Sequence, residues 1–119
     1  MMEILLAGEM WNIEFMETDK IAEYYENDTG FKSVKLFGFC DFYHDTIVID
    51  INLCRNEILN TLRHELTHAL VHILGHNYTG KYNEEQLCNL VAVFSPIVEK
   101  VVKDFLANDE VKKILKNRH

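Results

Sequence analysis

Little in this sequence interrupts regular structure. The 119 residues include one proline and five glycines, and they contain no Gly/Ser/Pro-rich linker, internal repeat or low-complexity segment. We therefore expect a single domain, residues 1–119, which is long enough to bury a core without disulfide or metal staples.

Cysteine is also scarce, with Cys40, Cys54 and Cys88 widely spaced, odd in number and without a CxxC pair. This pattern predicts reduced thiols in a cytosol-like compartment. The N-terminal segment lacks a cationic region ahead of its apolar residues, and no apolar run approaches the length of a membrane span. The expected location is therefore the cytoplasm, without a membrane partner.

Positive charge is limited as well. The formal net charge is −7, and no run of Lys and Arg precedes the C-terminal tail, residues 110–119. We interpret that tail as a short solvated helix. This excess of negative charge argues against nucleic acid or an anionic membrane as the main partner. The oligomeric state stays open.

The residues that are present predict strands first and helices after. Short apolar runs in residues 3–15 suit the start of a sheet, and residues 19–28 have helical spacing. Residues 33–43 and 46–53 are β-rich and predict a hairpin, with the second strand either at the sheet edge, where it could bind an extended peptide, or inside the sheet. This order predicts an α+β fold in which a small N-terminal antiparallel sheet packs on helices.

From about Cys54 the apolar period becomes helical. Apolar residues recur every three or four positions through residues 58–74, with Gly75 as a plausible C-cap. A second apolar stripe runs through residues 87–94 to Ser95 and Pro96. Since proline suits the first turn of a helix better than its interior, we expect a kink or a new helix at Pro96, capped by Ser95.

The first of these helices carries the sequence HELTH, in which His64 and His68 lie four residues apart around Glu65. Residues at this spacing share one helix face, so both imidazoles can approach one metal ion. Glu65 is displaced by about 100° around the axis. It can therefore reach a metal-bound water without ligating the metal. In zinc hydrolases with this motif the metal lowers the pKa of the water and the glutamate takes its proton.

A catalytic zinc needs a third protein ligand. The extended pattern HExxHxxGxxH fails, because Val71 and Leu74 occupy its last two defined positions. His72 continues the histidine stripe but lies about 12 Å along the axis from His64, which suits a supporting role. The next helix offers Glu84 and Glu85.

HELTHAL, followed by an acidic residue that opens the next helix, resembles the gluzincin metallopeptidases, whose large members include thermolysin. The small size and the preceding hairpin look most like the compact ImmA/IrrE-like and phage-borne versions, over roughly residues 35–95. In that family a glutamate ligand is followed by any residue, then apolar, small, Asp/Asn, apolar, apolar and small. The pattern from Glu85 matches throughout and that from Glu84 does not, although apolar clustering alone places Glu84 nearer the core. The resemblance makes Asn89 a partner that orients a ligating histidine.

The expected function is thus hydrolysis of peptide bonds in a peptide or protein substrate, with zinc held by His64, His68 and Glu85 and water activated by Glu65. Peptidase activity is implied by the resemblance alone. One alternative is a non-catalytic regulatory or binding module with a structural metal site, and another is a metal-free core helix. Oxyanion stabilisation has several candidates, namely Tyr43, His44, His76, Tyr78 and Tyr82.

Overall fold

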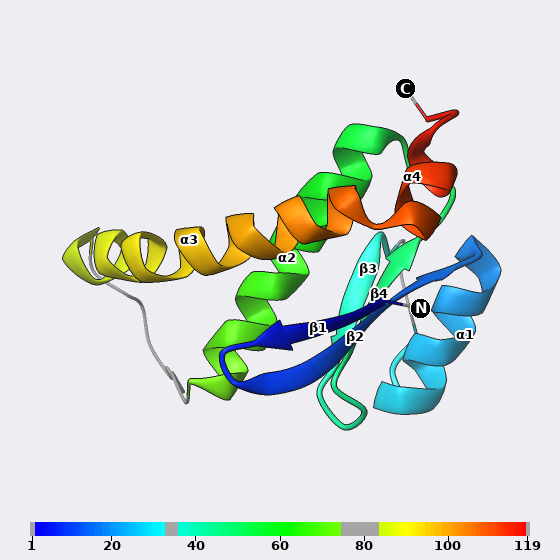
Figure 1. Cartoon of the computed structure of the whole chain (residues 1–119). Coiled ribbons are helices and arrows are strands. Elements are labelled where there is room, and N and C mark those ends of the chain that lie inside the picture. The colour runs from blue at the N-terminus through cyan, green and yellow to red at the C-terminus, as the bar shows by residue number, and fades with distance from the viewer. Residues whose placement is uncertain (1, 33–35, 75–83, 119) are drawn as a thin grey trace.

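The computed structural model describes residues 2–32, 36–74 and 84–118 and has an α+β fold (Figure 1). Within this part of the chain, four strands and four helices follow the order β1 (Met2–Leu6), β2 (Glu9–Met16), α1 (Thr18–Thr29), β3 (Gly38–Asp41), β4 (Thr46–Asp50), α2 (Arg55–Ile73), α3 (Glu84–Ala107) and α4 (Asp109–Leu115). The expected order of strands before the long helices is confirmed, and the helix expected from residues 19–28 is α1. None of the described helices is long and apolar enough to cross a membrane.

The strands form one sheet in the order β1-β2-β4-β3. β1 and β2 make a hairpin whose two turn residues, Ala7 and Gly8, both have positive φ, the pattern of a type I′ turn. The predicted hairpin of β3 and β4 is confirmed. The sheet is mixed rather than antiparallel, because β2 pairs with β4 in parallel. β4 is therefore an internal strand, and β1 and β3 are the two edge strands of the described sheet.

Alternation along the strands gives the sheet two apolar faces. Ile47 and Ile49 of β4 join the main core with α2, α3 and α4, whereas Val48 points to the opposite face. That second face is covered by α1, whose Ile21 packs with Val48 and Phe39. The edge strand β3 thus has α1 on one side and α2 on the other.

The helix α2 forms because its apolar residues repeat at helical spacing and face the sheet. Its buried apolar side chains are Ile58, Leu62, Leu66, Ala69 and Leu70. The helix begins with a capping box, in which the backbone N–H of Cys54 donates to Oε1 of Glu57 at 3.1 Å.

β3 and α2 approach each other closely at Gly38. A Cβ atom at this position would lie 2.5 Å from the carbonyl oxygen of Val48 and 2.7 Å from Cγ2 of Thr61. Real Cβ atoms do not approach other atoms this closely, so any other residue would force the strand and the helix apart. The absence of a side chain at Gly38 is what lets the edge strand lie against α2.

The expected interruption at Pro96 differs from the structure, in which α3 runs as one helix from Glu84 to Ala107. Pro96 removes one backbone hydrogen bond, to the carbonyl of Ala92. Both residues are exposed, so water can satisfy that carbonyl. Packing of Phe94 and Val98 on either side of the proline holds the helix on the core.

The C-terminal tail contains the short helix α4, as expected. Asn108 caps it by accepting a hydrogen bond from the backbone N–H of Val111. Val111 and Leu115 are buried in the main core, so the tail is anchored rather than merely solvated. The predicted C-cap at Gly75 lies outside the described residues.

Candidate metal centre

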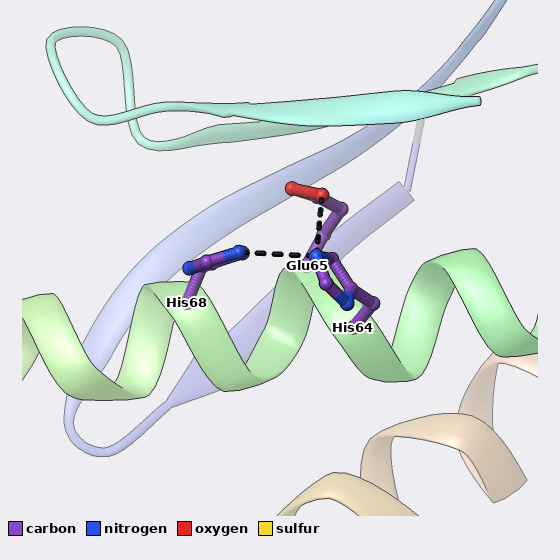
Figure 2. A group of neighbouring side chains, drawn as sticks. All are labelled: His64, Glu65 and His68. Atoms are coloured by element: carbon purple, nitrogen blue, oxygen red, sulfur yellow. Dashed lines mark hydrogen bonds and ion pairs between the residues drawn. The ribbon is translucent and has the colours of Figure 1, made fainter. Parts of the chain in front are cut away.

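The helix α2 brings His64, Glu65 and His68 together on the side that faces the edge strand. Figure 2 shows the two imidazoles side by side, with the Glu65 carboxylate turned toward the strands. The two Nε2 atoms are 3.1 Å apart, and Oε1 of Glu65 lies 3.9 Å from Nε2 of His64. The three residues thus form one group of converging ligand atoms.

The spacing of the two nitrogens suits a metal ion. Two nitrogens bound to a tetrahedral zinc at about 2.0–2.1 Å would be about 3.3 Å apart. The observed separation of 3.1 Å is close to this value. Both histidines are exposed, so an ion can reach them from solvent. The residues present therefore fit two ligands of a zinc site.

Glu65 differs from the histidines because it is buried, with 6% of its surface exposed. Burial raises the pKa of its carboxyl group, while His68, Cys40 and His64 act in the opposite direction. The thiol of Cys40 on β3 donates to the backbone carbonyl of Glu65 at 3.0 Å. This contact ties the edge strand to α2 at the candidate site.

A groove of about 380 Å³ opens beside these residues, between the start of β3 and the N-terminal half of α2. Its lining residues are Leu36, Phe37, Gly38, Glu57, Asn60, Thr61, His64 and Glu65. Among the described residues β3 pairs with β4 alone, so its outer edge has no strand beside it. His64 and the buried carboxylate of Glu65 therefore face an open groove.

The residues predicted on the next helix lie apart from this group. Glu85 and Asn89 are both exposed on the first turns of α3, and Glu85 does not belong to the converging group around His64. The side chain of Glu84 lies outside the part of the structure that is described. The choice of Glu85 as third ligand stays a prediction.

His72 stands outside the group as well. Its ring stacks on Phe42 in the turn between β3 and β4, with centroids 4.4 Å apart and an angle of 25° between the planes. This contact fastens the C-terminal part of α2 to the hairpin. His72 therefore contacts the hairpin here, and its supporting role at the metal site stays a prediction.

Of the residues expected to stabilise an oxyanion, the structure describes two, His44 and Tyr43. His44 bonds through Nδ1 to Asp41 at 2.6 Å, and Asp41 also accepts a hydrogen bond from Tyr24 of α1. This network lies on the sheet face that α1 covers, away from Glu65. Tyr43 is 86% exposed beside His44. The remaining candidates, His76, Tyr78 and Tyr82, are outside the described residues.

Three residues near the site were not singled out as site residues by the sequence, namely Cys40, Gly38 and Glu57. Cys40 and Gly38 alternate with Phe39 on β3, which places them on the α2 face once β3 is known to be an edge strand. Glu57 precedes His64 by two helical turns, a spacing that could have placed it on the same stripe. Strand alternation and helical spacing could have indicated these three positions. Using those patterns, however, requires knowing which strand packs on which helix.

Comparison with known proteins leaves this arrangement without a match. No family model, curated protein or solved structure matches the chain.

Proposed function

We propose that this chain is a zinc-dependent peptidase of the gluzincin type, in which His64, His68 and Glu85 hold the metal. The observation that carries the proposal is a pair of imidazole nitrogens 3.1 Å apart with a buried carboxylate beside them. The proposal includes a cytoplasmic location, consistent with three free cysteines.

When bound, the ion would act as a Lewis acid that polarises a peptide carbonyl and lowers the pKa of water. Glu65 is the proton acceptor in this scheme. Its carboxylate is fixed by burial under β3 and points toward the strands rather than along the histidine pair (Figure 2). It is thereby placed to take a proton from water and to return it to the leaving amine.

The substrate in this proposal is an extended polypeptide. The outer edge of β3 offers backbone N–H and C=O groups for pairing with a peptide strand, as in β-strand addition. The groove adjoins this edge and ends at His64 and Glu65. A peptide laid along β3 would pass its main chain over both residues.

The third ligand requires a rearrangement in this scheme. Arg63, next to His64, pairs with Glu99 of α3 at 2.9 Å. Glu85 precedes Glu99 by 14 residues, which is about 21 Å along a straight helix at 1.5 Å per residue. For Glu85 to reach the ion, the first turns of α3 must move toward α2, and Pro96 is where the helix bends most easily.

The decisive experiment compares the wild type with Glu65→Gln. Both proteins are purified without a histidine tag, loaded with zinc and incubated with a mixed peptide library, and cleavage is followed by mass spectrometry. We expect Glu65→Gln to lower the cleavage rate by at least about 100-fold, because general-base catalysis is removed. Its zinc content and melting temperature should match those of the wild type.

The exposed Glu3→Gln serves as a matched control and should retain full activity. If the wild type binds one zinc per chain but cleaves no peptide, the peptidase proposal is wrong. The non-catalytic metal-binding module would then take its place. That second function is favoured by the distance of Glu85 from the histidine pair, which leaves two histidines as the ligands already assembled.

A further inference from the structure

A second pocket, of about 510 Å³, is formed by the start of α2, the end of α3 and the C-terminal tail, elements that lie side by side in Figure 1. Its lining residues are Arg55, Leu106, Lys112, Leu115, Lys116 and Arg118. Four of these six are cationic, out of twelve lysines and arginines in the whole chain. Positive charge is thus concentrated at one place in a protein whose net charge is −7.

The charge of this pocket is not neutralised within the described part of the chain. The ion pairs among the described residues involve other side chains, and none of the four cations has a carboxylate partner there. Nη2 of Arg118 donates to the backbone carbonyl of Ile51 at 2.9 Å. Nε of the same guanidinium is buried and has no hydrogen-bond partner among the described residues. The contact with Ile51 therefore orients the guanidinium and leaves its charge uncompensated.

The ordinary roles of surface cations explain this arrangement in part. Lys112 and Lys116 lie at the end of α4, where the helix dipole favours positive charge. Arg55, in contrast, is the first residue of α2, where the dipole disfavours a cation. Lys112 and Lys116 are also four residues apart on one helix face and repel each other. A bound anion would relieve the repulsion that these like charges produce.

The size and lining of the pocket indicate the class of this anion. Its volume falls within the range of about 300–1,000 Å³ that is usual for small-molecule sites. A phosphate group carries about −1.5 to −2 charges at pH 7, so two phosphate groups balance four cations. Arginine and lysine both bind phosphate through charge-assisted hydrogen bonds. We propose that this pocket binds a small organic molecule with two phosphate groups, such as a nucleoside diphosphate.

A compact ligand fits the pocket better than an extended polyanion does. The surface beyond the four cations is strongly acidic, because the whole chain has a net charge of −7. That surface would repel nucleic acid or an anionic membrane. Leu106 and Leu115 supply apolar lining for the organic part of a small ligand.

The pocket is separate from the candidate metal centre. Arg55 and His64 are nine residues apart on α2, which is about 13.5 Å along the helix axis. The groove beside His64 and this pocket have no lining residue in common. The inference therefore goes beyond the peptidase proposal and does not rest on it.

The test measures the binding of pyrophosphate, ADP and adenosine by isothermal titration calorimetry. The full chain is first stripped of metal on a chelating resin, so that no probe binds through an ion at His64. We expect pyrophosphate and ADP to bind at one site per chain and adenosine not to bind. Raising the salt from about 0.05 M to 0.5 M should weaken both complexes several-fold, because charge interactions in an open pocket are screened.

Two double variants locate the site. Lys112→Gln/Lys116→Gln should lower the affinity for pyrophosphate and ADP by about tenfold or more, since two charge-assisted contacts are lost. Glutamine and lysine have similar helix propensities, so α4 should remain folded. Lys103→Gln/Lys113→Gln removes the same charge from exposed positions that do not line the pocket. This control should bind both probes within about twofold of the wild type.

Arg55→Gln tests the pocket from a different helix. It should weaken pyrophosphate binding by about threefold or more, because one of the four cations is removed without any change to α4. Circular dichroism and the melting temperature establish that each variant is folded. If the double variant on α4 unfolds, Arg55→Gln decides whether the pocket is the site.

Each outcome supports or overturns the proposal. Binding of pyrophosphate and ADP that is lost in the pocket variants and kept in the control supports it. Absence of binding by the wild type overturns it, as does an equal loss in the two double variants, which would assign binding to overall charge. If pyrophosphate binds and ADP does not, the organic ligand is overturned. Cosedimentation with phosphatidylglycerol vesicles without pyrophosphate binding would replace the small ligand by a membrane surface.

Discussion

Two clusters of histidine and carboxylate lie on opposite faces of the edge strand β3. One is His64, Glu65 and His68 on α2, and the other is Asp28, Asp41 and His44 around the β3–β4 turn and the end of α1. Both contain residue types that bind metals. They differ in what their polar atoms already contact.

In the second of these, which we call the hairpin cluster, the carboxylate of Asp41 already accepts hydrogen bonds at all of its acceptor positions. It accepts the Tyr24 hydroxyl at 2.5 Å, His44 Nδ1 at 2.6 Å, and the backbone N–H groups of Tyr43 and His44 at 3.0 and 3.1 Å. About four lone-pair sites are thereby occupied, and the side chain is entirely buried. This cluster holds a turn in shape.

In the α2 cluster the Nε2 atoms of His64 and His68 face each other. Two acceptor atoms of this kind at 3.1 Å leave either a shared proton or an ion as the natural bridge. The comparison teaches that residue type alone does not mark a metal site. The atoms must also be available.

The largest expected effect tests this difference directly. His64→Ala should lower zinc affinity by more than about 100-fold, whereas His44→Ala should leave it unchanged. Zinc should raise the melting temperature of the wild type and of His44→Ala but not of His64→Ala, because only a bound ligand stabilises the folded state. Competition with a chromophoric chelator and thermal unfolding measure the two quantities. Equal zinc affinity in all three proteins would remove the distinction between the clusters.

The second-largest expected effect tests whether Glu85 is the third zinc ligand of the α2 cluster. Glu85→Ala should weaken zinc binding by about 10- to 100-fold, since a carboxylate ligand is lost. Glu84→Ala is the matched control and should bind zinc like the wild type. The same chelator competition applies. A loss of affinity in Glu84→Ala alone would mean that the family pattern was assigned one residue too late.

The smallest effect concerns the hairpin cluster. Burial acts to raise the pKa of Asp41, but hydrogen bonds from Tyr24 and His44 outweigh it, so the pKa is lowered in the folded state. Its stabilising contribution is therefore complete above the unfolded pKa of about 3.9 and is lost as the pH falls through the folded value.

Asp41→Asn should lower the free energy of unfolding by about 1–2 kcal/mol at pH 7, because its amide group cannot accept all the donors that face it. The gap to the wild type should narrow below about pH 4, as urea unfolding at several pH values would measure. Asp28→Asn, at an exposed position, should change stability by less than about 0.5 kcal/mol. Zinc affinity at pH 7 should be unchanged in both variants.

The local features of the fold were predictable from the sequence. The apolar spacing of α2 predicted the burial of five of its side chains, although the stripe also includes Leu74, which is 43% exposed. The β-rich runs predicted the hairpin. The HExxH spacing predicted that His64 and His68 converge, since helical geometry alone brings residues four apart together.

Features that depend on distant contacts were not predictable in this way. The parallel pairing of β2 with β4 joins strands separated by a helix and another strand, and it makes β4 internal. The continuity of α3 through Pro96 depends on tertiary packing that outweighs the local cost of proline. The burial of Glu65 likewise needs β3 above it, which no pattern within α2 reveals.

The close approach at Gly38 has a consequence for how the groove responds to change. Gly38 has no side chain, and the space that a Cβ atom would occupy there is bounded by the carbonyl oxygen of Val48 on β4 and by Cγ2 of Thr61 on α2. A side chain at position 38 would therefore widen the groove, whereas replacing Asn60 would alter its polarity without touching this contact. The contact of Gly38 with Thr61 thus sets the width to which a bound molecule must conform.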